Sequence, residues 1–348
     1  MDKEKYMKRC IQLASYGKLH AAPNPLVGAV IVHKGIIIGE GFHIQSGKAH
    51  AEVNAINSVK DQSLLPESTI FVSLEPCSHT GKTPPCVDLI INKKIPHVVI
   101  GCQDPFSKVA GRGIAKLKEQ GIKVEIGILE NECKELIHRF YIFQEEKRPY
   151  ILLKWAESAD GYIDQIRSSG TPTLLSSPLS SILTHKRRAE VESILVGRRT
   201  ALLDNPSLTT RHWYQKDPIR LIIDRYLSLP NTLHIFDGST PTFIFTEVDK
   251  KSNFKNRTYI QLDFNADILT QILNWMYFQN IQSVLVEGGA QLHQSFIDAD
   301  LWDEIHIEES PQSILKGVSA AQIPTHTKYQ RVKKMGRYYR IYKKKEWV

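Results

Sequence analysis

Two short segments of the chain carry side chains that commonly bind zinc. Residues 49–54 read AHAEVN and include His50 and Glu52, and residues 75–86 read EPCSHTGKTPPC and include Cys77 and Cys86. Imidazole and thiolate groups are preferred zinc ligands, and three of them leave one position of a tetrahedral ion open. Because residues two apart on a helix point about 200° apart, Glu52 need not be a ligand beside His50 and can instead reach a water bound to the metal. The pattern predicts a catalytic zinc site.

This set of residues is typical of zinc deaminases. In such enzymes the ion activates a water for attack on an amino-bearing ring carbon, and a glutamate that is not a ligand moves the protons. Glu52 is therefore expected to carry a proton from the water to the ring nitrogen and then to the leaving ammonia. An alternative is a structural zinc closed by His79 as a fourth ligand, in a chain that serves as a scaffold.

The spacing of the cysteines separates this chain from deaminases of nucleic acid bases. Those enzymes generally have two residues between the cysteines, whereas eight separate Cys77 from Cys86. With NPLVGAV upstream, HAE followed by PCSHTGKTPPC resembles the deaminase half of the bifunctional riboflavin-biosynthesis deaminase-reductases. The resemblance implies an N-terminal cytidine-deaminase-like α/β/α domain for a phosphorylated pyrimidine, with Asn24 and His79 contacting the substrate.

Three segments of the second half resemble the reductase of the same family. They are KWAESADGYI at 154–163, SILVGRRTALLDNPSLTTR at 193–211 and VLVEGGAQLHQSF at 284–296, the last matching a VEGGxxLxxSF motif. The resemblance implies a dihydrofolate-reductase-like α/β domain that uses NADPH to reduce the ribosyl group to ribityl. The residues that it implies for cofactor binding are Ala156, Leu174, Gly197, Thr200, Asp204, Arg225, Gly288 and Gly289. Those implied for the substrate are Arg188, Leu208, Arg211 and Glu287, with Lys154 and Asp204 as catalytic residues.

Elementary chemistry agrees with several of these assignments. Gly288 and Gly289 lie between an apolar strand and a helix, where small residues and free backbone N–H groups suit a diphosphate. Arg225 follows the strand IRLIID and is a candidate for the extra phosphate that separates NADP from NAD. Arg188 and Arg211 are candidates for the sugar phosphate, because a guanidinium engages phosphate in a bidentate manner. No GxGxxG motif occurs, so a Rossmann domain is not expected.

The hydrophobic pattern alternates between strands and helices in both halves, which predicts two layered α/β domains. Pro149 ends one helical stretch just before a new apolar strand, so the expected domains are residues 1–147 and 148–348. The expected helices are 3–18, 49–59, 87–93, one ending at 121, 135–147 and 180–191. The expected strands are a hairpin turning at 34–35, then 69–76, 97–102, 123–128, 150–156, 193–197, 219–224, 242–246 and 283–289.

Composition limits the partners. No apolar run reaches the ~20 residues of a membrane helix, and five cysteines in 348 residues make no disulfide framework, so a cytoplasmic enzyme without a membrane partner is expected. Nine basic residues and one acidic residue from Lys328 onward account for the whole net charge of +8. RVKKMGRYYRIYKKKEW is interpreted as a solvated final strand, which leaves open a homo-oligomer paired through it. The competing function, a nucleoside or RNA deaminase with an RNA-binding second half, requires basic surface well before this tail.

Overall fold

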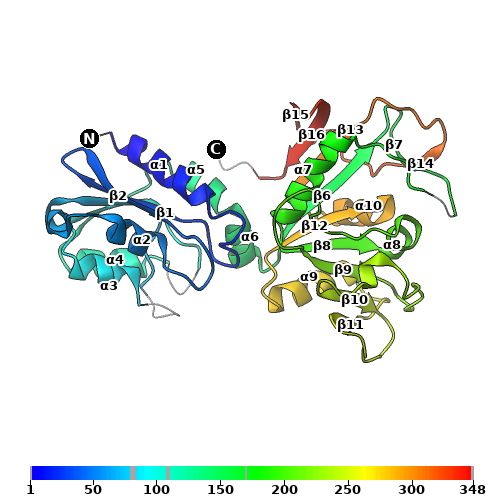
Figure 1. Ribbon diagram of the computed structural model, residues 1–348, viewed down its shortest axis with the longest axis horizontal. Helices are drawn as coiled ribbons and strands as arrows, with labels where there is room; N and C mark the ends of the chain where they lie inside the picture. Colours follow the sequence, from blue (N-terminus) through cyan, green and yellow to red (C-terminus); the bar gives the residue numbers. More distant parts are fainter. Residues whose placement is uncertain (1, 79–83, 107–109, 169–170, 346–348) are drawn as a thin grey trace. The chain divides into compact units, whose positions relative to one another are not determined.

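The computed structural model describes residues 2–78, 84–106, 110–168 and 171–345, which fold as two compact units that divide between Lys147 and Arg148 (Figure 1). Each unit combines a β-sheet with helices, which confirms the predicted mixed α/β class. No helix among the described residues is long and apolar enough to cross a membrane.

The first unit is built on a five-stranded sheet. Its order is β2-β1-β3-β4-β5, with β1 antiparallel to both neighbours and the last three strands parallel. The predicted hairpin is confirmed, with a turn at Lys34 and Gly35, which both have positive φ. The strands are β1 Gly28–His33, β2 Ile36–Phe42, β3 Thr69–Leu74, β4 His97–Cys102 and β5 Lys123–Ile126.

Helices cover both faces of this sheet, as the two separate apolar clusters of the unit show (Figure 1). Alternate strand residues enter opposite clusters, so Ile31 packs with α2, α3 and α4 while Val30 packs with α1 and α5. The unit is therefore an α/β/α sandwich. Its helices are α1 Lys3–Ser15, α2 Ala51–Ser58, α3 Cys86–Asn92, α4 Arg112–Glu119, α5 Glu130–Leu136 and α6 His138–Glu146, with a 3₁₀ turn η1 at Gln62–Glu67.

The second unit contains a nine-stranded sheet of order β11-β10-β9-β8-β12-β6-β13-β16-β15. Neighbours from β11 to β13 are parallel, and the β15–β16 hairpin continues the sheet antiparallel to β13. A small separate sheet pairs β7 with β14. The strands are β6 Tyr150–Glu157, β7 Tyr162–Gln165, β8 Ser193–Gly197, β9 Ile219–Ile223, β10 Thr242–Thr246, β11 Arg257–Gln261, β12 Ser283–Gly288, β13 Glu304–Glu309, β14 Gly317–Ser319, β15 Gln330–Lys334 and β16 Arg337–Lys343.

One large apolar cluster forms the core of the second unit. Residues of the central strands, among them Leu153 and Val286, pack against Leu273 and Met276 of α9 and Phe296 of α10. A capping box and a proline in the first turn begin α7, as is usual at helix N-termini. The helices are α7 Pro178–Ala189, α8 Arg198–Asp204, α9 Ile268–Phe278 and α10 Ala290–Asp298, with η2 at His234–Phe236.

Two sequence-based expectations are wrong. The basic tail is a hairpin rather than one solvated strand, and Tyr339 and Tyr342 are buried because β16 pairs with β13 of its own unit. Met335 and Gly336, both at positive φ, make the turn between its strands. The helix expected at 135–147 is two helices, α5 and α6, which adjoin at Ile137.

Candidate active sites

His50, Cys77 and Cys86 form one cluster of candidate metal ligands in the first unit. His50 Nδ1 lies 3.5 Å from Cys77 Sγ and 3.4 Å from Cys86 Sγ, and the three ligand atoms lie within 4.8 Å of one another. A tetrahedral zinc with bonds of ~2.05 Å to nitrogen and ~2.3 Å to sulfur would put those atoms about 3.6 Å apart. The cluster therefore fits zinc, and within the described residues it is the only such group.

The fold positions these ligands at the starts of two helices and after a strand. His50 is the N-cap residue of α2, Cys86 is the first residue of α3, and Cys77 follows the end of β3. The backbone N–H of Cys86 donates to Cys77 Sγ at 3.4 Å. A side-chain hydrogen bond with Cys86, and then His50, lower the pKa of Cys77, which favours the thiolate form that binds metals.

Glu52 lies in the first turn of α2 and is buried, with 4% of its surface exposed. Burial, and in addition the nearby Cys77, raise the pKa of its carboxyl to about 7. A carboxyl that titrates near neutrality can both accept and release a proton. His79, the predicted substrate contact and alternative fourth ligand, lies outside the described residues.

His43 is a neighbour of the cluster that the sequence reasoning missed. Its ring lies edge-to-face against that of His50, with centroids 5.4 Å apart. His43 Nδ1 is 3.1 Å from the carbonyl oxygen of Ala49, and Nε2 is 3.0 Å from the side-chain nitrogen of Asn24. The amide N–H of Asn24 thus donates to His43, which makes Nδ1 the protonated nitrogen. The predicted substrate residue Asn24 is therefore joined to the metal cluster through His43.

Glu75 is a second residue that the sequence reasoning passed over. Its buried carboxylate accepts backbone hydrogen bonds from Gly111 at 2.9 Å, Gly113 at 3.0 Å, Ile114 at 3.2 Å and Asp104 at 3.4 Å. These bonds tie the start of α4 and the end of β4 to the segment that leads into Cys77. The signal in the sequence is an acidic residue directly before the Pro-Cys step.

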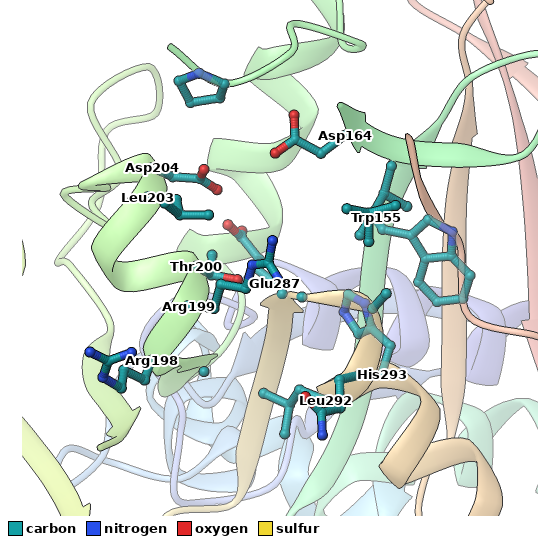
Figure 2. Close-up of a pocket in the computed structure, with 18 of the residues that line it drawn as sticks. Trp155, Asp164, Arg198, Arg199, Thr200, Leu203, Asp204, Glu287, Leu292 and His293 are labelled. Carbon is teal, nitrogen blue, oxygen red and sulfur yellow. The ribbon is translucent and has the colours of Figure 1, made fainter. Parts of the chain in front are cut away.

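A pocket of about 690 Å³ in the second unit collects most of the predicted reductase residues. This volume is within the range of ligand sites, which usually measure ~300 to 1,000 Å³. Asp204 and Thr200 of α8 lie on one side in Figure 2, with Glu287 of β12 between them and Trp155 of β6. The predicted residues that line it are Lys154, Ala156, Leu174, Gly197, Thr200, Asp204, Arg225, Glu287, Gly288 and Gly289.

Gly288, the last residue of β12, and Gly289, which follows it, leave room for Thr200. A Cβ atom on Gly288 would lie 3.0 Å from Thr200 Oγ1, and one on Gly289 would lie 3.1 Å from the same atom. Both distances are tighter than ordinary contacts. A side chain at either position would therefore require Thr200 to move by a few tenths of an ångström.

Lys154, Glu287 and Arg188 form a charged group at the pocket, in which Lys154 is buried and the other two side chains are about one-tenth exposed. Arg188 donates from Nε and Nη2 to the two carboxylate oxygens of Glu287, at 2.8 and 2.5 Å, and from Nη1 to the carbonyl oxygen of Thr209 at 3.0 Å. Burial opposes ionisation of Glu287, but the Arg188 guanidinium outweighs it and holds the pKa of this carboxyl below its usual value. Burial lowers the pKa of Lys154, which Glu287 partly offsets.

Other predicted residues already have partners in the chain. Asp204 pairs with Arg167, a residue that nothing in the sequence marked, and burial still raises the pKa of Asp204. Arg225 pairs with Glu247, with its Nε 2.8 Å from a carboxylate oxygen. Leu174 is 77% exposed at the pocket.

The structure does not bring every predicted substrate residue into the pocket wall. Among the described residues that line it, Arg188, Leu208 and Arg211 are not included. Arg188 reaches the wall through its bonds to Glu287, Leu208 is buried with φ +53°, and Arg211 donates to Thr209 Oγ1 at 2.8 Å.

Family models match both halves of the chain. The cytidine and deoxycytidylate deaminase zinc-binding region matches residues 1–102, and the RibD C-terminal domain matches residues 149–318. The riboflavin biosynthesis protein RibD of Bacillus amyloliquefaciens is 40% identical over 316 residues, which cover 88% of this chain and 84% of the relative. RibD of Escherichia coli (strain K12) is 34% identical over 329 residues, covering 90% and 88%.

Solved structures of similar proteins superpose over nearly the whole chain. The diaminohydroxyphosphoribosylaminopyrimidine deaminase/5-amino-6-(5-phosphoribosylamino)uracil reductase of Thermotoga maritima has a TM-score of 0.87 and 35% identity, covering 98% of each chain. Acinetobacter baumannii RibD has a TM-score of 0.88 and 28% identity, again over 98% of each chain. Together with the family models, these relatives show that the chain belongs to the RibD family of riboflavin biosynthesis proteins, as a bifunctional deaminase and reductase.

Proposed function

We propose that the first unit deaminates 2,5-diamino-6-(5-phosphoribosylamino)pyrimidin-4-one with zinc, and that the second reduces the ribosyl group of the product to ribityl with NADPH. The observation that carries the proposal is the convergence of the predicted residues. His50, Cys77 and Cys86 meet at zinc-like distances beside Glu52. Ten predicted reductase residues, from Lys154 to Gly289, line a single pocket.

In the deaminase, His50, Cys77 and Cys86 would hold zinc, and Glu52 would move the protons. Bound zinc supplies a Lewis acid that makes water a nucleophile near neutral pH. The Glu52 carboxyl takes the proton of the attacking water and delivers it to the ring nitrogen and then to the leaving ammonia. Its buried position and raised pKa suit both steps. We propose that His43 keeps His50 and Asn24 in place and that Asn24 and His79 contact the substrate.

In the reductase, the pocket would bind NADPH and the ring-opened sugar next to Lys154. NADPH supplies the hydride. Lys154 provides a buried positive charge where the sugar oxygen gains electrons, and the lowered pKa of its ammonium favours proton release. Gly288 and Gly289 allow close approach of the diphosphate, and Arg225 is the proposed contact of the extra phosphate. Glu287, fixed by Arg188, would bind the substrate.

The remaining proposed roles rest on the family motif. Asp204 is proposed to hold or move a proton at the reacting end of the sugar, with Arg167 fixing its carboxylate. Arg211 is proposed to bind the sugar phosphate, and Leu208 supports that segment. Ala156, Leu174, Gly197 and Thr200 complete the proposed cofactor wall.

The partner of this enzyme is proposed to be a phosphorylated pyrimidine rather than a nucleic acid. The RibD C-terminal domain model covers residues 149–318, which does not favour an RNA-binding second half. The basic tail, which alone suggested RNA, places Tyr339 in the core of the unit rather than on a stacking surface. Five free cysteines suit a reducing compartment, so we assign the enzyme to the cytoplasm.

A coupled assay tests the proposal directly. Zinc content of the purified protein is measured first, and ammonia release from the diaminopyrimidine ribosyl phosphate is then followed without NADPH. Addition of NADPH should start its oxidation only after ammonia has formed. Glu52→Gln should retain zinc and NADPH oxidation on already deaminated substrate while losing ammonia release. Ammonia release at the wild-type rate in this variant would remove Glu52 from the mechanism.

A further inference from the structure

A buried histidine in the wall of the reductase pocket has one ring nitrogen without a partner. His293 belongs to α10, is 1% exposed and lines the pocket. Figure 2 shows it across the pocket from Asp204 and close to Trp155. The rings of His293 and Trp155 lie 4.9 Å apart at 36°, so the indole fixes the imidazole. None of the proposed catalytic steps uses this histidine.

The single hydrogen bond of His293 determines what its other nitrogen can do. Nε2 lies 3.1 Å from the carbonyl oxygen of Val286, which can only accept, so Nε2 carries the hydrogen and Nδ1 the lone pair. Nδ1 is buried and has no hydrogen-bond partner within the described part of the chain. Burial, and in addition Lys154, lower the pKa of His293 to about 4, so the ring stays neutral and Nδ1 remains an acceptor.

The surroundings of Nδ1 point to a ligand as its missing donor. The carboxylates of Glu287 and Asp204, which share the pocket wall and pair with Arg188 and Arg167, are acceptors and cannot donate to Nδ1. Lys154, Glu287 and His293 line the same pocket, and the two charged groups both act on the His293 ring. The VEGGxxLxxSF motif leaves position 293 open, so the motif itself does not demand this acceptor.

We propose that His293 is a ligand-binding residue of the reductase pocket whose Nδ1 accepts a hydrogen bond from an N–H or O–H donor of the bound ligand. Two groups supply such a donor, the carboxamide of the nicotinamide ring and a hydroxyl of the ring-opened ribosyl phosphate. In either case the bond orients the reacting end of the ligand beside Lys154. This inference rests on the proposed reductase function.

A matched pair of variants isolates the acceptor. His293→Phe keeps the ring volume against Trp155 and has no acceptor, whereas His293→Asn retains an amide near the position of Nδ1. Both variants lose the hydrogen bond to Val286. A difference in ligand affinity between them therefore reports only the presence of an acceptor at the position of Nδ1. Asp298→Asn, at an exposed position of the same helix and not among the residues that line the pocket, is the control for changes in α10.

Binding is measured without turnover, by NADPH fluorescence and by calorimetry with the ribosylaminouracil phosphate. His293→Phe should weaken binding of the ligand that supplies the donor about 2- to 13-fold, the size of one hydrogen bond, and His293→Asn should recover most of the loss. If the donor is the carboxamide, the loss disappears with reduced 3-acetylpyridine adenine dinucleotide phosphate, which lacks the amide. If it is a sugar hydroxyl, only the calorimetric affinity changes.

Nitrogen NMR supplies a readout independent of affinity. The unprotonated nitrogen of His293 should shift on addition of the ligand that donates to it. Wild-type affinity for both ligands in His293→Phe, equal losses in the Phe and Asn variants, or an unshifted nitrogen signal would each overturn the inference. Failure of the wild-type protein to bind NADPH would instead refute the proposed reductase function.

Discussion

Glu75→Gln should destabilise the first unit and leave the second unit unchanged. The carboxylate presents one oxygen to Gly113 and Ile114 and the other to Gly111 and Asp104. In the glutamine variant one oxygen can still serve the first pair, but an NH₂ group faces the buried N–H groups of the second. Loss of one charge-assisted bond costs ~1.5 to 3 kcal/mol and an unpaired buried N–H costs ~1 to 3 kcal/mol. The expected loss in free energy of unfolding is about 3 to 5 kcal/mol.

The distribution of cysteine and tryptophan makes this change measurable unit by unit. All five cysteines lie in the first unit, and the buried thiols of Cys10, Cys102 and Cys133 should react with a thiol reagent only when that unit unfolds. Four of the five tryptophans, Trp155 among them, lie in the second unit, so the fluorescence reports mainly that unit.

Urea titrations of Glu75→Gln should therefore shift the thiol transition to lower urea and leave the fluorescence transition in place. Glu119→Gln, the same change of charge at an exposed position of α4, should shift neither. If Glu75→Gln and Glu119→Gln had the same urea midpoint in the thiol assay, the proposed role of the Glu75 carboxylate in holding Asp104 and the start of α4 would be refuted. Equal shifts of both transitions would contradict the independence of the two units in stability.

Three further substitutions test the reductase unit. Lys154→Ala should slow NADPH oxidation by ~100-fold or more, as for loss of a general acid, with ammonia release unchanged in the same sample. Gly288→Ala should weaken NADPH binding about tenfold in a fluorescence titration, because its Cβ would displace Thr200 from 3.0 Å. Arg188→Met leaves Glu287 buried without its partner and should cost about 3 to 5 kcal/mol in the fluorescence-monitored transition at pH 7. Arg188 holds the pKa of Glu287 below its usual value, so the ion pair stabilises the folded unit at neutral pH and stabilises it less as the pH falls. The difference in free energy of unfolding between wild type and Arg188→Met should therefore shrink toward pH 4.

The sequence predicted the elements whose pattern is local. The β1–β2 hairpin, α2 and β3 follow from apolar periodicity and turn residues, and these elements carry or adjoin His50 and Cys77. Motif spacing was enough to name His50, Cys77 and Cys86, whose candidate ligand atoms the structure brings within 4.8 Å of one another. Once these three side chains lie this close together, few arrangements of their ligand atoms remain possible.

Features that depend on distant partners could not be predicted in this way. Nothing in EIHIEE indicates a buried strand, yet Glu308 of β13 is fully buried because β6 and β16 flank it and two serine hydroxyls bond its carboxylate. The pairing of Asp204 with Arg167 joins segments whose contact arises only from the fold. The basic tail could not be placed for the same reason. Its alternating pattern fits a strand exposed to solvent and a strand paired with a neighbour equally well.

The position of β6 in its sheet has a consequence for how the protein is made. β6 is the first strand of the second unit, but its two neighbours are β12 and β13, which are more than 120 residues further along the chain. The first unit has all its strands within residues 28–126 and can close its sheet once they have left the ribosome. The second unit must keep β6 unpaired until most of the chain has been synthesised, which makes its folding slow and late. During synthesis the deaminase half should thus be assembled well before the reductase half, and exposed β6 is the segment most in need of protection from aggregation.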